Sequence, residues 1–519
     1  MSFLKKYSHL LSLVIITLIS RLVFATHYLY SWDAAQLALA LKSFDLASHQ
    51  PHPPGYILYV ALGKMLNFFI PDANTVYVYL SIIVSVLTVI LFYFFLNLLV
   101  VDKKFSFLIT LILIINPYFW FFGEVASTYI FDAFFSLLFA CLTWLIYKRN
   151  DPKFFLIFST VLGLAGGFRL SLIYLFLPLW FYAGYQLIKK KRLNWCKFFL
   201  AVFFLIFVFS LWFTPLIYLS HGFNNWWRVN NWLLNEAANA TSIMRGAPTQ
   251  IVLETSKSLL KVILIIINFI FLSLLGLLSL SKNKIKPPLW LFFWWLAPSL
   301  FFYIFIHFGN KGYLMTVASA LIILVSWPLF YLWQTKKKIF YLVLLIILIG
   351  ELNLFLINKD NALTKKINYD FDQKNLARLN KKIDSYLNSI KQFPSQETIV
   401  VTLKNFHCPS DTNPDQKCRG EYFRQLEYYL SDYDVYELFG DSPAYFHVKN
   451  YSPLKLIRTN GIAINQKIKQ IIIICDELNP ELKQDVTIVN ANESNIPIFI
   501  IDISLQPTKN WGQYIFTKK

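Results

Sequence analysis

Acidic side chains and cysteines are scarce in this chain, and the motifs of several common soluble enzyme classes are missing from it. The 519 residues include 29 Asp and Glu against 48 Lys and Arg, and only five cysteines. The sequence has no Cys-x-x-Cys pair or Cys/His spacing typical of zinc, no P-loop, no nucleophile elbow and no internal repeat. These absences argue against a zinc-binding module, a P-loop nucleotide-binding domain and a solenoid.

Hydrophobic residues make up 56% of the chain and aromatic residues 18%, with a mean hydropathy of +0.50. Such a composition is typical of a polytopic membrane protein. The positive charge is unevenly placed: residues 1–357 hold 27 Lys and Arg against 10 acids, whereas residues 358–519 hold 21 against 19. The excess lies in short loops between apolar segments, so it indicates membrane topology, and we expect no nucleic-acid partner.

The apolar segments predict about eleven transmembrane helices, since about 20 apolar residues are needed to cross the hydrocarbon core. Two shorter amphipathic stretches, 34–46 and 55–70, are predicted to lie at the outer interface. Glycines at 163, 166 and 167 indicate close helix packing or a helix kink rather than a nucleotide site. The predicted spans are 8–26, 76–101, 105–122, 128–147, 153–168, 170–188, 197–219, 259–281, 288–308, 313–334 and 339–357.

Lys and Arg cluster in every second loop, which places those loops in the cytoplasm. The N-terminus is then cytoplasmic, the loop after the first span lies outside, and an odd number of spans places residues 358–519 outside as well. We therefore expect a multi-pass protein of the cell membrane with lipid as its surroundings. The clusters are Lys5-Lys6, Lys103-Lys104, Lys148-Arg149, Lys189–Arg192, Lys282/Lys284/Lys286 and Lys336–Lys338.

The last 162 residues differ in character from the rest. A polar helical pattern at 370–391 is followed by strand-like runs at 398–403, 435–439, 471–475 and 496–503, with a helical pattern at 421–431. This alternation predicts a small α/β domain over 358–519, after an all-α membrane domain over 1–357. Cys408 and Cys418 flank a polar loop of this domain and could form a disulfide in an oxidising compartment.

The loop after the first span, SWDAAQLALALKSFDLASHQPHPPGYILY at 31–59, carries the most unusual polar residues. Asp33 follows a tryptophan where a membrane helix emerges, a position at which a carboxylate must be solvated, paired or used. One interpretation is structural, because Asp33 begins a helical pattern and Asp is a good N-cap. His52 and Tyr56 flank Pro-Pro-Gly, which forces an extended stretch ending in a turn.

This loop resembles the first extracytoplasmic loop of the GT-C glycosyltransferases. These polytopic enzymes, which include protein O-mannosyltransferases and lipid A aminoarabinose transferases, take a sugar from a polyprenyl- or dolichyl-phosphate carrier. The likeness is to a branch with the pattern WD-x-x-E … HPPGYPLY, and it is strong over 21–66 and weaker to about 357. Here Gln36 replaces the Glu, so the loop offers no second carboxylate there for a metal. The resemblance implies that Asp33 is the general base and that Glu124, in a run similar to the branch's AEVY, joins it.

Two acids near the second outer loop are further candidates. Glu124, Thr128 and Asp132 would share one face if a helix began near Glu124. Asp132 lies inside an apolar segment, where an acid is either paired with a buried arginine, such as Arg169 or Arg21, or marks a functional cavity.

Cations are needed near a departing lipid phosphate, which gains charge as the anomeric bond breaks. The segment HFGNKGYL, with His307 and Lys311, resembles the late family loop in which basic residues meet the carrier phosphate. An alternative is a short positively charged turn. Arg169 and Arg228 are further candidates, Arg228 lying in an aromatic loop (222–257) that fits an interfacial belt or a sugar platform.

The resemblance thus implies an inverting transfer of a sugar from a polyprenyl-phosphate-linked donor to a hydroxyl of a protein, glycan or lipid acceptor. We expect no cofactor and no metal. Two alternatives are a flippase for lipid-linked sugars and a non-catalytic membrane anchor. The sequence shows no repeated halves of the kind that many transporters have, which argues against the flippase. The predicted site comprises Asp33 and Glu124 for catalysis, Lys311, His307 and Arg169 for the donor phosphate, and His52, Tyr56, Asp132 and Arg228 for substrate positioning.

The predicted topology can be tested with reporter fusions. A fusion after Lys338 is expected to report a cytoplasmic position and a fusion after Asn358 an external one, because one apolar span separates the two points. Alkaline phosphatase fusions report an external position and green fluorescent protein fusions a cytoplasmic one, so the pair measures both sides of the membrane. Cytoplasmic signals from both positions would show that the last span does not cross the membrane.

Overall fold

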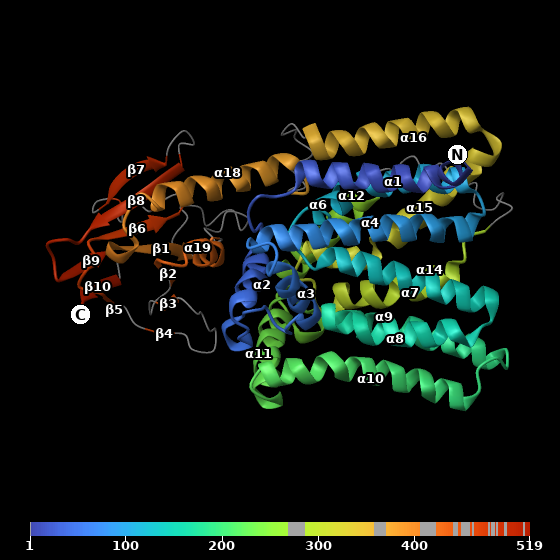
Figure 1. Cartoon of the computed structure of the whole chain (residues 1–519), viewed down its shortest axis with the longest axis horizontal. Helices are drawn as coiled ribbons and strands as arrows, with labels where there is room; N and C mark the ends of the chain where they lie inside the picture. The colour runs from blue at the N-terminus through green and yellow to red at the C-terminus, as the bar shows by residue number, and fades with distance from the viewer. Residues whose placement is uncertain are drawn as a thin grey trace. The chain divides into compact units, whose positions relative to one another are not determined.

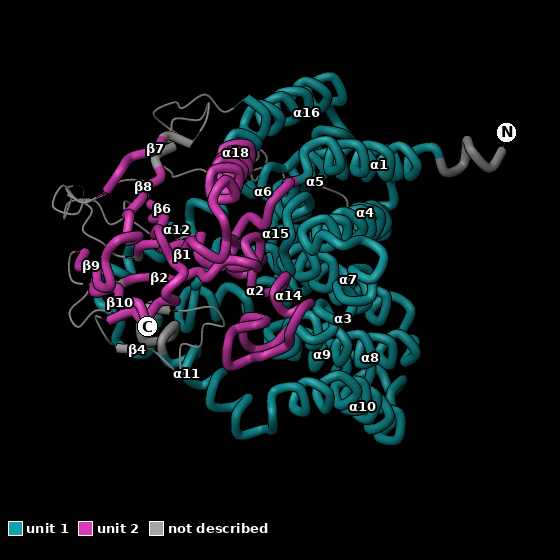
Figure 2. Tube along the Cα trace, turned by 60° about the vertical axis from the view of Figure 1, so that its left-hand side comes forward, with its two compact units in different colours: residues 1–25, 56–375 teal, residues 26–55, 376–519 magenta. Residues whose placement is uncertain are grey.

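The structure, a computed structural model, describes most of the chain. The described residues are 2–267, 286–357, 370–404, 422–439, 445–447, 457–458, 461–475, 478, 483, 486–491, 496–511 and 514–519. The predicted pairing of Cys408 with Cys418 lies outside these residues. Two compact units are present: residues 1–25 with 56–375, and residues 26–55 with 376–519 (Figure 2).

The first unit is a bundle of long apolar helices, and its members α4, α7, α8 and α10 pack in that order (Figure 1). Two short π-helical segments, Phe302–Ile306 and Asn353–Ile357, extend two of its helices. The helices are α1 (Ser2–Phe24), α3 (Ile57–Asn67), α4 (Ala73–Val100), α5 (Lys103–Ile115), α6 (Pro117–Phe122), α7 (Tyr129–Arg149), α8 (Pro152–Phe168), α9 (Ser171–Lys189), α10 (Trp195–Leu219), α11 (Phe223–Thr241), α12 (Thr249–Ile266), α14 (Leu289–Phe301), α15 (Met315–Thr335) and α16 (Lys337–Leu352).

Seven helices among the described residues are long and apolar enough to cross a membrane, which confirms the predicted class of multi-pass all-α protein. They are Ala73–Val100, Tyr129–Arg149, Ser171–Lys189, Trp195–Leu219, Leu289–Ile306, Lys311–Thr335 and Lys337–Ile357. The predicted span 105–122 is interrupted, because the Asn116 side chain caps a new helix that begins at Pro117. The predicted span 259–281 lies partly outside the described residues.

Burial separates central from peripheral helices. In the apolar window of α7, 83% of the residues are buried, whereas only 17% are buried in that of α10. Helix α10 nevertheless approaches α8 closely: a Cβ at Gly163 would lie 2.6 Å from the Leu205 carbonyl oxygen, and the Trp212 indole donates to the Gly163 carbonyl at 2.7 Å. The packing role predicted for these glycines is therefore confirmed.

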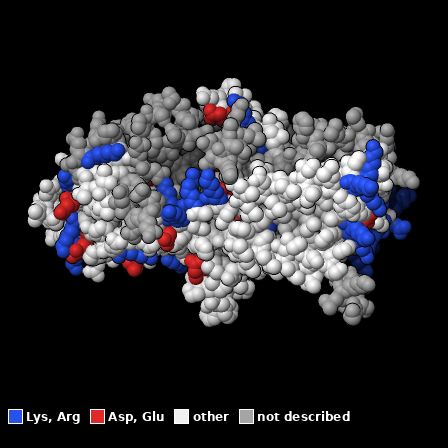
Figure 3. Space-filling view, turned by 90° about the horizontal axis from the view of Figure 1, so that it is seen from above, with Lys and Arg blue, Asp and Glu red and all other residues white. Residues whose placement is uncertain are grey.

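The charges of the helical unit fit its apolar character. Lys103, Lys148 and Lys189 lie at helix ends. The face that Figure 3 shows includes a broad white stretch that is almost free of charged side chains, with a group of Lys and Arg at its edge. This separation of charge from apolar surface is what a bilayer requires.

The second unit contains the predicted strands, together with several that the sequence did not reveal. A seven-stranded sheet has the order β4-β3-β2-β1-β6-β8-β7, in which β1 is parallel to β2 and β6, and a smaller sheet has the order β5-β10-β9. The strands are β1 (Thr398–Lys404), β2 (Asp434–Phe439), β3 (Tyr445–His447), β4 (Ile457–Arg458), β5 (Gly461–Ile464), β6 (Gln470–Ile474), β7 (Thr487–Ala491), β8 (Ile496–Asp502), β9 (Thr508–Trp511) and β10 (Tyr514–Lys518).

Alternation along β1 builds two cores, one on each face of the large sheet. Ile399, Val401 and Leu403 belong to the core shared with the small sheet. Val400 belongs to the other core, which includes side chains from α18 (Gln373–Ile390) and α19 (Phe423–Tyr429).

The loop after α1, predicted to be the first outer loop, belongs to this second unit rather than to the helical one. Residues 26–55, which contain α2 (Trp32–Lys42) and the short 3₁₀ turn η1 (Leu46–Ser48), group with residues 376–519. Tyr28 and Trp32 pack against the core that α18 and α19 form. The unit boundaries therefore differ from a single division after residue 357, because a loop from the N-terminal third completes the C-terminal domain.

Candidate active site

The first outer loop gives Asp33 a defined local setting. Ser31 is the N-cap of α2, and its hydroxyl accepts a hydrogen bond from the Ala34 amide at 3.2 Å. Asp33 lies in the first turn, where a negative charge is favoured by the helix dipole. The alternative that Asp33 is the N-cap is therefore wrong, and its carboxylate is left available for another role.

Asp33 and His52, which are 19 positions apart in the sequence, are neighbours. The His52 Nδ1 lies 3.9 Å from the Asp33 carboxylate and 3.0 Å from the Gln36 Oε1. An amide oxygen only accepts hydrogen bonds, so the contact with Gln36 makes Nδ1 the donor nitrogen of the ring. The Asp33 side chain is 42% exposed and that of His52 is 26% exposed, so both can reach a ligand.

The other polar residues of this loop are used to hold its shape. Asp45 accepts hydrogen bonds from the Ala47 amide at 3.0 Å and from the Ser48 hydroxyl at 2.5 Å. Burial, together with the nearby charges of His52 and Arg424, lowers the pKa of His49 to about 2. His49 therefore stays neutral at physiological pH, and Asp33 is the acid of this loop that is open to solvent and not tied to the backbone.

In the helical unit, Asp132 is paired with Arg169. The Arg169 Nη1 donates to the Asp132 Oδ2 at 2.7 Å, and both side chains are at least nine-tenths buried. This confirms the predicted pairing of Asp132 with a buried arginine. Helix α7 begins only at Tyr129, however, so the predicted helical face shared by Glu124, Thr128 and Asp132 is wrong.

Tyrosine rings surround the Arg169 guanidinium. Its carbon lies 4.6 Å from the ring centroids of both Tyr129 and Tyr313, at cation–π distance. Tyr56, predicted as a substrate-positioning residue, is within electrostatic range of the same group. We call Arg169, Asp132, Tyr129, Tyr313 and Tyr56 the arginine–tyrosine cluster. The roles of Tyr129 and Tyr313 were not predicted, although both follow outer-loop segments that carry candidate polar residues.

The segment 307–313 packs against this cluster. A Cβ at Gly312 would lie 2.4 Å from the Tyr129 ring, so only glycine allows this approach without a shift. The His307 ring lies 5.9 Å from that of Tyr313. The structure therefore brings His307 and Arg169, two of the three predicted phosphate-binding residues, into contact with the ring of one tyrosine, Tyr313.

Lys311 points to a different partner. Its backbone carbonyl accepts from the Tyr118 hydroxyl at 2.7 Å, while its ammonium forms an ion pair with Asp370. The ion pair is partly open, since the Lys311 side chain is 34% exposed and that of Asp370 is 56% exposed. An exposed pair of this kind contributes little stability, so an anion can replace the carboxylate at low cost.

Glu124 is fully buried beside Arg21 of α1, with which it interacts electrostatically. The Arg21 guanidinium lies 5.0 Å from the Trp120 ring centroid. The Trp120 side chain lies close enough to Glu124 to interact with its carboxyl group as well. Glu124 therefore lies inside the bundle, and its predicted contact with a substrate stays a prediction.

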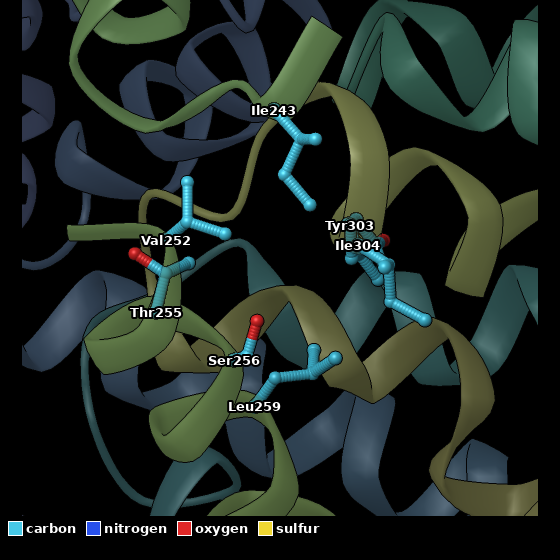
Figure 4. Close-up of a pocket in the computed structure, with 7 residues that line it drawn as sticks. All are labelled: Ile243, Val252, Thr255, Ser256, Leu259, Tyr303 and Ile304. Carbon is cyan, nitrogen blue, oxygen red and sulfur yellow. The ribbon is translucent and has the colours of Figure 1, made fainter. Parts of the chain in front are cut away.

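Two other features lie apart from these groups. Arg228, on α11, is exposed and donates to the Asn225 side chain at 2.9 Å. A small pocket, with a volume of about 10 Å³, has room for about one water and none for a sugar (Figure 4). It is lined by Ile243, Val252, Thr255, Ser256, Leu259, Tyr303 and Ile304.

Within the described part of the chain, no group of three or more His, Cys, Asp or Glu could hold a metal ion.

Comparison with known proteins gives a structural likeness and no sequence match. No protein-family model and no curated protein matches the sequence. Nine chains of solved structures match. One is ArnT from Cupriavidus metallidurans, in a crystal structure with undecaprenyl phosphate bound. Its TM-score is 0.55 at 11% sequence identity, and the match covers 96% of this chain and 98% of that chain.

The likeness to ArnT runs through both units, since it covers nearly all of each chain. This chain therefore has the GT-C fold, an all-α membrane part followed by a domain that contains strands. The predicted fold class is confirmed.

The buried Arg169–Asp132 pair yields a prediction on stability. Asp132→Asn or Arg169→Gln is expected to lower the free energy of unfolding by about 3–5 kcal/mol, because each leaves one charge buried without its partner. The double variant is expected to lose much less than the sum of the two. Thermal unfolding of the purified protein in detergent measures this order of stabilities.

Lys190→Ala serves as the control, since its contact with the Asn150 side chain is exposed. It should shift the free energy of unfolding by no more than about 0.5 kcal/mol. Additive effects of Asp132→Asn and Arg169→Gln would contradict the pairing.

Proposed function

We propose that the chain is an integral membrane glycosyltransferase that moves a sugar from a polyprenyl-phosphate-linked donor to an acceptor hydroxyl on the extracytoplasmic face. One observation carries the proposal: the fold matches that of ArnT over 96% of this chain, and that crystal structure holds undecaprenyl phosphate. The lipid carrier is therefore the donor that we expect, with no nucleotide sugar. The acceptor is a protein, a glycan or a lipid, and the compartment is the cell membrane.

The proposed reaction is a single displacement at the anomeric carbon. The acceptor hydroxyl gives its proton to a carboxylate, and its oxygen attacks the carbon from the face opposite the phosphate. The bond between the carbon and the phosphate oxygen breaks, and polyprenyl phosphate leaves with both bonding electrons. The configuration of the sugar is inverted.

Asp33 is the proposed general base. Its carboxylate is the part-exposed acid of the first loop, and Ser31 rather than Asp33 caps the helix. His52 lies 3.9 Å away, and its hydrogen bond to Gln36 holds the ring in place. The part-exposed Asp33 carboxylate is thus accessible to an acceptor hydroxyl, with the His52 ring beside it.

Lys311 is the proposed first contact of the donor phosphate. It is a part-exposed cation whose present partner, Asp370, is exchangeable. Arg169 is committed to Asp132 through one nitrogen, but its planar guanidinium offers further N–H donors. His307 lies beside Tyr313 on the same segment as Lys311, and we propose it as a third contact of the leaving phosphate.

The buried residues of the predicted site act in this proposal by orientation. Asp132 fixes Arg169, and Tyr56 contributes to the same cluster. Glu124 neutralises Arg21 and so orients the segment that leads into α7.

Asp33→Asn is expected to lower the turnover of sugar transfer by about 10²–10⁴-fold, because an acceptor hydroxyl is a poor nucleophile without a base. Binding of undecaprenyl phosphate should be unchanged. The assay follows release of undecaprenyl phosphate by mass spectrometry from a panel of undecaprenyl-phosphate-linked hexoses and pentoses, with native membrane extract as the acceptor source.

Asp72→Asn is the matched control. Asp72 caps α4 by accepting from the Thr75 amide at 2.7 Å, and Asn caps a helix about as well as Asp. Near-normal turnover by the Asp33→Asn variant would refute the proposed role of Asp33 as the general base. No transfer by the wild-type protein with any donor would refute the glycosyltransferase itself and favour a transporter.

Lys311→Ala and Asp370→Asn are expected to act in opposite directions on donor binding. Removing the cation should weaken binding of undecaprenyl phosphate roughly 10-fold or more, the value of one charge-assisted hydrogen bond. Removing its carboxylate partner should strengthen binding, because the phosphate then meets no competitor. Titration of purified protein with undecaprenyl phosphate measures both.

Lys338→Ala, an exposed lysine at the predicted cytoplasmic end of α16, is the control and should leave the affinity unchanged. Equal affinities of all three variants for undecaprenyl phosphate would show that Lys311 does not contact the phosphate. Arg169 or His307 would then be the proposed contact.

A further inference from the structure

The C-terminal domain holds the first outer loop through one buried arginine. Arg424 lies on α19 and is fully buried. Its Nη2 donates to the Ser48 carbonyl oxygen at 2.6 Å, and its Nη1 donates to the Glu427 carboxylate at 2.6 Å. Its guanidinium carbon also lies 5.9 Å from the Trp32 ring centroid. A single side chain thus joins α19 to both ends of the segment that carries Asp33.

Further contacts from the same domain hold the start of the loop. The Tyr28 hydroxyl donates to the Asp384 carboxylate at 2.6 Å. The Tyr429 hydroxyl accepts from the Leu29 amide at 2.9 Å. The rings of Trp32 and Phe423 lie 5.9 Å apart. Residues before Asp33 are therefore tied to α18 and α19, and Ser48, after it, is tied to α19 by Arg424.

The position of these contacts relates them to the proposed base. Trp32 directly precedes Asp33, and Ser48 lies four residues before His52. Asp33 and His52 are 3.9 Å apart, although 19 positions separate them in the sequence. Their separation depends on how the intervening residues fold back, and Arg424 contacts that stretch at Trp32 and at Ser48.

The Arg424 ion pair is poorly explained as a source of stability alone. Burying a charged pair costs desolvation free energy that the attraction between the charges barely repays, and apolar replacement of such pairs is often neutral or stabilising. The planar guanidinium fork, in contrast, fixes two acceptors in one plane at once. What Arg424 adds over an apolar residue is the directed bond to the Ser48 carbonyl.

We propose that Arg424 is a positioning residue for the reaction, and that the C-terminal domain serves to hold the first outer loop so that Asp33 and His52 keep their separation. This inference rests on the proposed function. It gives the C-terminal domain a part in catalysis without any contact of its own with substrate.

Three variants of the full-length protein test the inference. Arg424→Leu combined with Glu427→Leu removes both charges, and so avoids leaving a buried carboxylate unpaired, while it deletes the bond to Ser48. Arg424→Lys keeps the charge but replaces the planar fork by a point charge. Lys469→Ala combined with Glu397→Ala is the matched control, because it removes an ion pair of the same domain, 2.7 Å in length, away from the loop.

The double leucine variant is expected to retain its melting temperature and its affinity for undecaprenyl phosphate, while kcat for sugar release falls roughly 10- to 100-fold, as for a misplacement of about 1 Å. Arg424→Lys is expected to recover part of kcat, and the control is expected to match the wild type. If Arg424 has only a structural role, kcat is expected to fall only in proportion to the fraction of protein that is folded. Wild-type kcat in a folded double leucine variant overturns the proposal.

Hydrogen exchange separates a failure of this inference from a failure of the proposed function. The double leucine variant is expected to show faster amide exchange within residues 26–55 than the control variant, with little change in the strands of the large sheet. Unchanged exchange in 26–55 overturns the loop-holding role even if transfer is observed. If the wild type transfers no sugar but the loop exchanges faster, the proposed function fails and the positioning role in catalysis fails with it, whereas the structural link stands.

Discussion

The end of the helical unit at which α7 begins depends on the compensation of buried charge at Arg169. A lone carboxylate at Asp132 would be very costly in an apolar interior, so the bond to Arg169 decides how α7 meets the junction of α8 and α9. Tyr129 and Tyr313 then cover the guanidinium, which draws the segment 311–313 against α7. The close contact between Gly312 and Tyr129 follows from this arrangement. One ion pair thus organises the residues that we propose for the phosphate.

The scarcity of acids makes the assignment of the base more specific. Asp72, Asp102 and Asp151 cap helices with their side chains. Glu124 and Asp132 lie buried beside arginines, and Glu351 is buried near the Asn116 amide. In the first loop, Asp45 is bonded to the turn that follows it. Asp33 differs from these acids in being part-exposed beside a histidine, without a cap to make.

Much of the fold was predictable from the sequence, because long apolar runs and continuous β-branched strands are local signals. The membrane helices, β1, β2, β6, β8 and the pairing of Asp132 with an arginine all follow from such patterns. The cap at Ser31 was missed because Ser and Asp are equally good N-caps and stand two residues apart. The contacts of Arg424 with the first loop could not be predicted, since they join residues 376 positions apart and no pattern within either segment indicates the other.

The C-terminal unit is built from two segments that lie far apart in the sequence, and this sets an order for its folding. Residues 26–55 emerge early in synthesis, but the segments that they pack against begin at residue 376. At about 5–20 residues per second, roughly 15–65 s of translation separate the two. During that interval Trp32 and Tyr28 lack their apolar partners on α18 and α19. The proposed catalytic loop can therefore reach its final structure only after the last third of the chain has been made, so that a prematurely terminated chain is inserted but left with an unfinished site.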